Sequence, residues 1–516
     1  MPRRHIRVTG APEAPLRAAL TALRNELGVS GGFPPEVLAE AERAAKAPVL
    51  PPYVASDSHD ASDSHGASGS HGASGSHGAS GSYDATDIPF FTVDPPASTD
   101  LDQAIHLSRQ GAGYRVRYAI ADVAAFVVSS GALDREAHRR VTTLYFPDER
   151  VPLHPELLSE GAASLLPDQD RLAVLWTIDL DGDGRTLAVD VRRALVRSRA
   201  KLDYAGVQQR IDAGTAEEPL SLLKEVGELR ERLEVERGGI SLRVPEQEIV
   251  ERDRDHTYEL AYRAPLPADG WNAQLSLLTG MAAADLMLAH GTGILRTLPA
   301  APDGAVGRLR RTAHALHIEW PHHVSYAELV RSLDPHRPHH AAFLQECTTL
   351  LRGAGYTVFR DGALPDITTH SAVAAPYAHC TAPLRRLADR YASEICLAAA
   401  AGRTVPDWVS AALDTLPARM AEGTRRAGTV ERECVDIVEA ALLGDRVGEV
   451  FDGWVVEVEE RRPGVGTVQL ESPAIIGRIE AGRGDRLPLG ERLRARLTQA
   501  DPQAGPGAAK VRFAPA

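Results

Sequence analysis

The chain has 516 residues, which is enough for two to four domains with at least one large core. Its composition, 43% hydrophobic and 25% charged, is typical of a soluble globular protein. The formal net charge of -13 does not by itself indicate a nucleic-acid partner. Because the average field repels polyanions, any such partner would have to bind in a local groove.

Targeting and compartment signals are sparse. The sequence contains no uninterrupted apolar run of about 18 residues, so we expect no transmembrane helix and no membrane partner. The first ten residues, MPRRHIRVTG, are not followed by the apolar segment of a secretory signal. The four cysteines are scattered, without CxxC spacing, which favours reduced thiols over disulfides or zinc. We therefore expect a cytoplasmic protein, and we expect it to be monomeric.

The N-terminal part divides into two regions. Residues 1–50 contain two helical patterns, APLRAALTALRNELG and PPEVLAEAERAAK, which predict either a helix-turn-helix-like unit or a packing appendage. Residues 51–86 hold a hexapeptide repeat of the ASGSHG type, which is typical of a flexible linker because it has little surface to bury. Its regularly spaced histidines are a weaker indication of metal binding.

The rest of the chain has mixed helical and strand patterns, followed by a β-rich end. Residues 87–443 have a continuous mixed α and β pattern, which predicts strands at 114–127 and 171–180, a hairpin through DGDG, and helices at 271–291 and 430–444. Residues 444–516 predict five short strands, the number that a small OB-type barrel needs. The expected fold class is α+β and multidomain, with a small helical N-terminal region.

One acidic motif in this part favours a turn rather than a metal site. The segment DLDGDGRTLAVD, residues 179–190, spaces its aspartates much like a calcium-binding EF-hand loop. An EF-hand needs a helix on each side, whereas both flanks here are β-rich. The segment therefore predicts a hairpin turn, and we reject calcium binding.

A second acidic segment, TVDPPASTDLDQAI, has stronger indications of chemistry. Asp94 follows a short apolar strand, and two prolines then force a loop. Asp100 and Asp102 are two residues apart, so an extended backbone directs both carboxylates the same way. Three hard oxygen ligands favour Mg²⁺, with Mn²⁺ as a substitute. The alternative is a solvated acidic turn.

Arginines near a helix start form another constellation. The segment YAHCTAPLRRLADRYASEI contains Arg385 and Arg386 just after a Thr-Ala-Pro break that predicts the beginning of a helix. Arginine at such a place suits phosphate, through paired hydrogen bonds and the helix dipole. The alternative is an amphipathic helix whose arginines pair with its own acids. Together with the acidic segment and the barrel, the pattern favours phosphodiester hydrolysis.

At these residues the chain resembles the ribonuclease II family of exoribonucleases, which are built on the RNB domain. The family pattern T-[IV]-D-x4-5-D-x-D-D-A-[IL] is matched from Thr92 to Ile105, and H-[YF]-T-S-P-I-R-R-Y-x-D is similar to His379–Asp389. The resemblance spans about residues 87–443, and the C-terminal barrel resembles the family's RNA-binding OB-fold. It implies processive 3′-to-5′ hydrolysis of single-stranded RNA with a free 3′ end, releasing nucleoside 5′-monophosphates with Mg²⁺.

The resemblance also implies roles for individual residues. Asp94, Asp100 and Asp102 would hold the metal, with two ions about 4 Å apart. Arg385 would stabilise charge on the scissile phosphate, and Asp102 and Arg385 would be the catalytic pair. The residues implied in RNA binding are Tyr145, which would stack on a terminal base, Tyr204, which would distinguish RNA from DNA, Arg385 and Arg386.

The chain departs from the family pattern in several places, two of which bear most directly on function. Gln103 stands where the family has a fourth aspartate; its carbonyl oxygen can still bind magnesium, but with one negative charge fewer. The N-terminal region is too short and too helical for the family's usual cold-shock barrels. These departures leave two alternatives open: a catalytically weakened RNB-fold RNA-binding protein, with Gln103 as the lesion, or a DNA exonuclease, against which Tyr204 argues.

Overall fold

The structure is a computed structural model that describes residues 14–48, 83–244, 246–252, 257–302, 304–351, 353–459, 461–470, 473, 475–482 and 484–516. Nearly all of the hexapeptide repeat, with the linker prediction made for it, lies outside the described residues. In the part that is described, no helix is long and apolar enough to cross a membrane.

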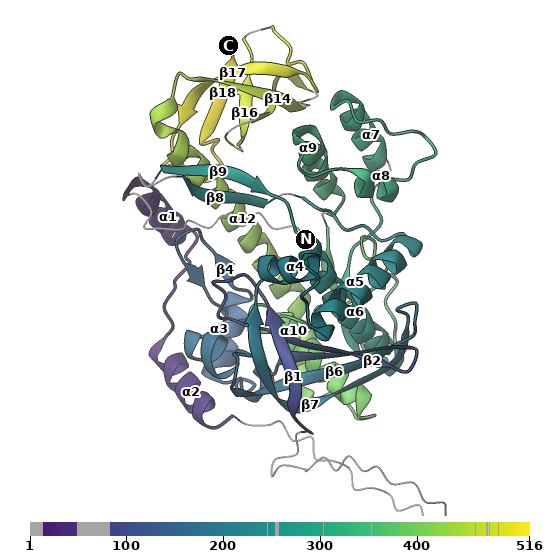
Figure 1. The fold of residues 1–516 in the computed structure, drawn as a ribbon. Helices are drawn as coiled ribbons and strands as arrows, with labels where there is room; N and C mark the ends of the chain where they lie inside the picture. The colour runs from purple at the N-terminus through teal and green to yellow at the C-terminus, as the bar shows by residue number, and fades with distance from the viewer. Residues whose placement is uncertain are drawn as a thin grey trace, which may run out of the picture.

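Figure 1 labels the helices and strands of the chain. The α-helices are α1 (Ala14–Glu26), α2 (Pro35–Lys46), α3 (Ala132–Arg140), α4 (Tyr204–Asp212), α5 (Glu218–Glu236), α6 (Pro267–His290), α7 (Ala305–Ala315), α8 (Tyr326–Ser332), α9 (Pro338–Cys347), α10 (Leu387–Ala400), α11 (Asp407–Leu413) and α12 (Leu416–Leu443). Short helical turns are η1 (Val123–Ala125), η2 (Leu157–Ala162), η3 (Thr348–Leu351) and η4 (Gly444–Arg446).

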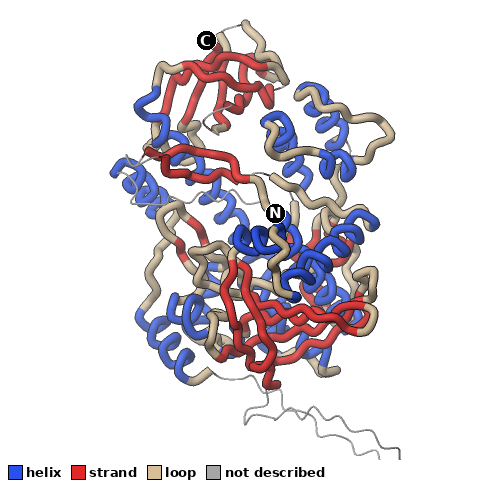
Figure 2. The backbone as a smooth tube through the Cα atoms, viewed as in Figure 1, coloured by secondary structure: helices blue, strands red, loops and turns tan. Residues whose placement is uncertain are grey.

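The strands follow the same convention. They are β1 (Tyr83–Val93), β2 (Gln103–Gln110), β3 (Gly113–Ala121), β4 (Leu144–Tyr145), β5 (Arg150–Val151), β6 (Asp170–Leu180), β7 (Thr186–Leu202), β8 (Glu246–Arg252), β9 (Thr257–Arg263), β10 (Gly293–Thr297), β11 (Gly355–Phe359), β12 (Thr369–His370), β13 (Ala375–Pro376), β14 (Val450–Glu459), β15 (Arg462–Leu470), β16 (Ile476–Glu480), β17 (Arg492–Ala500) and β18 (Val511–Pro515). Figure 2 shows how the strands gather at the two ends of the molecule, with helices between them.

The part of the chain that follows the N-terminal helices is built on a closed barrel in the order β1-β2-β3-β6-β7. The barrel closes where β1 runs parallel to β7, and its other neighbouring strands are antiparallel. Tyr118 on β3 lies opposite Trp176 on β6, and both are fully buried. Closure removes the exposed strand edges of the sheet and fixes the loops at the barrel ends, where the aspartates lie.

The strand predicted over 114–127 is only partly correct, because β3 ends at Ala121 and the chain turns into η1. Asp122 at this point is buried and accepts a hydrogen bond from Arg193 of β7 at 2.7 Å, an ion pair that anchors the turn. The following Val-Ala-Ala-Phe run is buried throughout. Periodicity alone cannot distinguish such a run from a buried strand.

Helices cover the barrel and connect it to the C-terminal end. Residues of α5, α6 and α10 share one hydrophobic cluster with the barrel strands. The long helix α12 continues from this cluster toward a second closed barrel, β14-β15-β16-β18-β17. The second barrel has the five strands that the sequence predicts, and the α+β multidomain class is confirmed.

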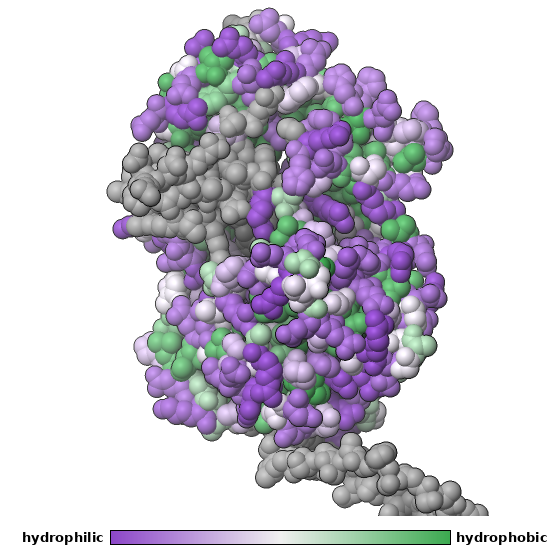
Figure 3. All heavy atoms as spheres, viewed as in Figure 1, coloured by the Kyte–Doolittle hydropathy of each residue, from purple (hydrophilic) through white to green (hydrophobic). Residues whose placement is uncertain are grey.

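The helices α7, α8 and α9 form a unit beside the second barrel. Their buried residues share a cluster with Val456 of β14 and with Val244. Figure 3 shows the visible face of this unit covered mainly by hydrophilic side chains, with hydrophobic ones scattered among them. The unit therefore buries one side and exposes the other.

The two N-terminal helices lie on different parts of the core. Leucines of α1 pack with α12 and with the β4–β5 hairpin, whereas α2 contacts α3 and η2. Arg24 of α1 donates to Asp148 at 2.8 Å and lies 3.1 Å from Glu149, at the tip of that hairpin. This arrangement agrees with a packing appendage and differs from a helix-turn-helix unit, whose two helices pack on each other.

A close approach between α6 and the segment before α10 gives a test of this packing. A Cβ atom at Gly280 would lie 2.2 Å from Cε2 of Tyr377 and 2.6 Å from the carbonyl oxygen of Ala378. We expect Gly280→Ala to lower the free energy of unfolding by about 1–3 kcal/mol, because the backbone must shift. The measurement is urea denaturation.

The control is Gly307→Ala in α7, where a Cβ would meet nothing within 4 Å. We expect this change to raise the free energy of unfolding by up to about 1 kcal/mol, because alanine is the better helix former. Equal denaturation midpoints for the two variants would contradict the packing described for Gly280.

A buried histidine gives a test by pH. His154 is 3% exposed, and burial, followed by repulsion from Arg390, lowers its pKa from 6.5 to about 3. As the pH falls below 6.5 the unfolded chain takes up this proton first, so the free energy of unfolding falls until about pH 3. We expect this residue to contribute at most about 1.4 kcal/mol per pH unit.

The measurement compares urea denaturation of the wild type and His154→Leu between pH 7.5 and pH 5. Leucine fills a similar volume and takes up no proton, so we expect a shallower loss of stability with acid in the variant. Identical slopes would show that His154 does not carry this acid sensitivity.

Candidate active site

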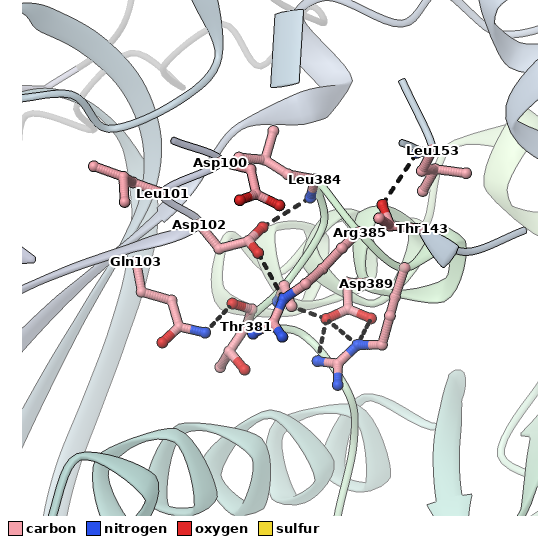
Figure 4. A network of polar contacts seen from close by, with 12 residues as sticks. Asp100, Leu101, Asp102, Gln103, Thr143, Leu153, Thr381, Leu384, Arg385 and Asp389 are labelled. Atoms are coloured by element: carbon pink, nitrogen blue, oxygen red, sulfur yellow. Dashed lines mark hydrogen bonds and ion pairs between the residues drawn. The ribbon is translucent and has the colours of Figure 1, made fainter. Parts of the chain in front are cut away.

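The site lies where the β1–β2 loop meets the start of α10 (Figure 4). Asp102 is 3% exposed and accepts from the backbone N–H of Leu384 at 2.8 Å and from Nε of Arg385 at 2.9 Å. These contacts join residues 282 and 283 positions apart in the chain. The structure thus brings together the two motifs that the sequence analysis had identified separately.

The charge of Asp100 acts on the pKa of each of the other two aspartates, Asp94 and Asp102. Burial raises the pKa of Asp102 to about 7, Arg385 opposes the shift, and Asp100 raises it further. Burial likewise raises the pKa of Asp94 to about 6, again opposed by Arg385 and assisted by Asp100. The carboxylates therefore lie in a partly dehydrated place where a positive charge stabilises their ionised forms.

Arginines supply positive charge in the described structure. Asp102 pairs with Arg385, and Asp100 pairs with Arg150. Among the described residues, no group of three or more histidine, cysteine, aspartate or glutamate side chains is arranged to hold a metal ion. The metal-ligand roles of Asp94, Asp100 and Asp102 accordingly stay predictions.

Gln103 is engaged within the protein. Its Oε1 accepts from the hydroxyl of Tyr118 at 2.5 Å, and its Nε2 donates to the carbonyl oxygen of Thr381 at 2.5 Å. Both ends of the amide are thus satisfied, and the side chain connects the barrel interior to the segment before α10. To bind a metal through Oε1, Gln103 would have to share or lose the Tyr118 contact, and its ligand role stays a prediction.

The segment that leads into α10, residues 381–386, is held in place by contacts with the first turn of that helix and with the residues just before β4. Asp389 accepts from the backbone N–H of Ala382 at 2.7 Å and from Arg386 through two nitrogens. The carbonyl oxygen of Arg385 accepts from Thr142 Oγ1 at 2.9 Å and from the Thr143 N–H at 3.1 Å. Arg386 is thereby committed to an ion pair, while its RNA-binding role stays a prediction.

The predicted nucleotide-contacting tyrosines both lie near this centre. Tyr145 is half-buried on β4 and interacts electrostatically with Arg385. Tyr204, the first residue of α4, accepts from Nδ2 of Asn272 at 3.2 Å. Burial, followed by the nearby Asp94 charge, raises the pKa of Tyr204 above its ordinary value. The raised pKa keeps Tyr204 neutral beside the acidic centre.

Three residues of the site were given no role in the sequence analysis. Arg150 ion-pairs with Asp100 and Glu160, and Asp389 orients the arginine-bearing segment. The sequence does predict that Arg150 lies beside Tyr145, because the two residues flank a Pro-Asp turn that predicts a short hairpin. No comparable signal exists for Glu160, because its position depends on how η2 packs against the β1–β2 loop.

Comparison with known proteins now places the chain. Residues 82–400, more than half of the sequence, match the RNB domain, and residues 449–516 match the RNase II-type exonuclease C-terminal S1 domain. Ribonuclease R of Escherichia coli K12 is 29% identical over 403 residues, covering 73% of this chain and 48% of that protein. The chain thus spans about half the length of this curated relative.

Solved structures share the fold. Mycoplasma genitalium RNase R in complex with ribose-methylated single-stranded RNA has a TM-score of 0.78 at 19% identity, covering 98% of this chain and 79% of that chain. Yeast Ssd1, described as a pseudonuclease, has a TM-score of 0.59 at 16% identity, covering 80% of this chain and 51% of that chain. With its barrels, its joined motifs and these matches, the chain belongs to the RNB-domain family of ribonuclease II type.

Proposed function

We propose that the protein is a divalent-metal-dependent exoribonuclease that degrades single-stranded RNA processively from its free 3′ end to nucleoside 5′-monophosphates. In this proposal it acts as a monomer in the cytoplasm, and Mg²⁺ is its metal, with Mn²⁺ as a substitute. Its catalytic domain spans residues 87–443 and its RNA-binding domain residues 444–516, preceded by a helical region at 1–50 and a linker at 51–86.

The observation that carries the proposal is the contact between Asp102 and Arg385. It places a buried carboxylate from the barrel against a guanidinium at the start of α10, 283 residues later. The Arg385 side chain is 41% exposed, so it lies at the surface of the site where a phosphate can reach it. Acidic groups beside an exposed arginine are the combination that phosphoryl chemistry uses.

The donor chemistry fits a hard divalent cation. Asp94, Asp100 and Asp102 offer carboxylate oxygens, the ligands that Mg²⁺ prefers, and burial raises the pKa of Asp94 and of Asp102. A cation at this place would relieve the repulsion that Asp100 exerts on both of them. When bound, the metal would supply Lewis-acid activation of water and of the phosphate.

The residues of the chain have complementary tasks in this proposal. Arg385, aimed by Asp102, neutralises charge on the scissile phosphate. Tyr145 stacks on the terminal base, a contact worth about 1–3 kcal/mol. Tyr204, oriented by Asn272, reads the sugar and favours RNA over DNA. Arg386 keeps the segment in shape through Asp389 and adds positive charge near the RNA path.

The C-terminal barrel offers a surface for the RNA strand. Arg494 and Arg496 are exposed and lie on the same outer face of β17, because side chains two residues apart along a strand point the same way. Positive side chains along an OB-type barrel attract the backbone of a single strand, despite the negative net charge of the whole chain.

The test is degradation of a 5′-labelled single-stranded RNA in Mg²⁺ and Mn²⁺ titrations, with a DNA oligonucleotide of matched sequence. We expect short end products from RNA and little turnover of DNA. We expect Asp102→Asn to slow hydrolysis at least about 100-fold, with RNA affinity within about threefold of the wild type, because the substituted amide keeps an acceptor for the Leu384 N–H but carries no charge.

The matched control is Asp170→Asn, which makes the same change at the first residue of β6, where Asp170 forms an exposed ion pair with Arg197 on the barrel surface. We expect wild-type rates from it. Absence of nucleotide release by the wild type across both titrations would refute the enzyme proposal, and comparable turnover of DNA would refute the choice of substrate.

The second candidate is an RNB-fold RNA-binding protein with weakened catalysis, favoured by the amide at Gln103 and by the fold shared with the pseudonuclease Ssd1. Gln103→Asp tests it. If the amide is a lesion, aspartate should raise the hydrolysis rate at least about tenfold, because it restores a metal ligand.

For the enzyme proposal we expect a different result from Gln103→Asp. The carbonyl oxygen of Thr381 loses its donor, so the free energy of unfolding falls by about 1–3 kcal/mol. The rate should rise by no more than about twofold. The readouts are the RNA degradation assay and urea denaturation on the same preparations.

A further inference from the structure

Arg150 occupies a place that neither the family resemblance nor the proposed function assigns. It begins β5, directly across the hairpin from Tyr145. One terminal nitrogen, Nη1, donates to Oδ1 of Asp100, and the other, Nη2, donates to Oε1 of Glu160. The guanidinium therefore bridges a predicted metal ligand and an acid that does not belong to the acidic motif.

The backbone that carries Arg150 is firmly held. At the hairpin tip Arg24 contacts Asp148 and Glu149, and its guanidinium lies 5.3 Å from the ring centre of Phe146. Behind the hairpin, the N–H of Leu153 donates to Oγ1 of Thr143 at 3.1 Å. Because the backbone is fixed at both places, a change of partner for Arg150 has to come from its side chain.

Glu160 is the partner that Arg150 keeps if Asp100 is taken by another cation. The hydroxyl of Thr99 donates to Oε2 of Glu160, and Nη2 of Arg150 also lies 3.2 Å from Oγ1 of Thr99. Glu160 is thus oriented by the residue that immediately precedes Asp100. Release of Asp100 would leave the guanidinium with two polar partners rather than none.

Asp100 is the acid for which two cations would compete. Its charge acts on both Asp94 and Asp102, so the cation that neutralises it influences the whole acidic centre. An arginine and a divalent ion cannot both occupy the same carboxylate oxygen, and each weakens the binding of the other.

We propose that Arg150 is an internal countercation that competes with the divalent metal for Asp100, and that Glu160 holds Arg150 once the metal has bound. The inference rests on the proposed metal site. Arg150 lowers the apparent metal affinity and keeps the acids neutralised without metal, while Glu160 offsets part of that effect.

The experiment measures Mn²⁺ binding to the full chain without RNA, by the electron paramagnetic resonance signal of free Mn²⁺. We expect Arg150→Met to lower the dissociation constant about tenfold or more, because the competing charge is gone. We expect Glu160→Gln to raise it about threefold or more, because Arg150 then has Asp100 as its remaining ionic partner. In the double variant the Glu160 effect should disappear.

The control is Arg197→Met, which removes the same charge from an exposed pair with Asp170 on the barrel surface. We expect its dissociation constant to lie within about twofold of the wild type. Thermal melting followed by circular dichroism checks folding. If Arg150→Met does not fold, Arg150→Gln removes the charge while keeping a donor for one acid, and the same decrease in dissociation constant is expected.

Several results would overturn the inference. If the charge-removing variant binds Mn²⁺ equally or more weakly, Arg150 braces Asp100 instead of competing for it. If the Mn²⁺ dissociation constant changes in the same direction in the Arg150 and Glu160 variants, Arg150 likewise braces Asp100 instead of competing for it. Absence of Mn²⁺ binding in both the wild type and the Arg150 variant also refutes it.

The outcome is separable from that of the proposed function. If Mn²⁺ binding shifts as expected and no RNA is degraded, the proposed activity fails and the competition stands. If metal-dependent degradation is observed and the Arg150 variants leave Mn²⁺ affinity unchanged, the competition fails and the activity stands.

Discussion

The site depends on one buried carboxylate, Asp102, that is satisfied by two groups 282 and 283 residues further along the chain. A carboxylate with 3% exposure is costly unless its charge is compensated. The Leu384 N–H and the Arg385 guanidinium provide that compensation. The barrel and the start of α10 are therefore registered against each other by electrostatics as well as by the hydrophobic cluster they share.

Around this contact, further carboxylates of the site form ion pairs with neighbouring arginines. Asp100 pairs with Arg150, and Asp389 with Arg386. A buried group of this kind adds little net stability over a well-packed apolar one, but it penalises any arrangement that leaves a charge unpaired. The balance thus selects one arrangement of the loops, which a catalytic site needs more than it needs extra stability.

Much of the fold and of the site could be predicted from the sequence because the signals are local. The end of β1 before Asp94, the hairpin through DGDG and the five C-terminal strands follow from short patterns of apolar residues and turns. The pairing of Asp102 with Arg385 could be inferred only from the family resemblance, since no local rule relates residues 283 positions apart. The ion pairs of Arg150 and Glu160 depend on tertiary packing alone.

The end of the strand predicted over 114–127 was misplaced for a related reason. Hydrophobic periodicity shows that a run is buried but not which partner buries it, and the turn at Asp122 is fixed by an arginine on another strand. Gln103 illustrates a related limit, because its sequence position predicts a metal ligand, a role that stays a prediction, and does not reveal that its amide joins Tyr118 to Thr381. In both cases the deciding partner lies far along the chain.

The position of α1 has a consequence for how the molecule divides into parts. Arg24 holds the tip of the hairpin whose two strands carry Tyr145 and Arg150, and the leucines of α1 share a cluster with α12 and the second barrel. The first helix therefore links the hairpin beside the site to α12 and the second barrel. A shortened chain that begins at β1 would keep Asp94, Asp100 and Asp102. It would lose the contact of Arg24 with the hairpin that carries Tyr145 and Arg150.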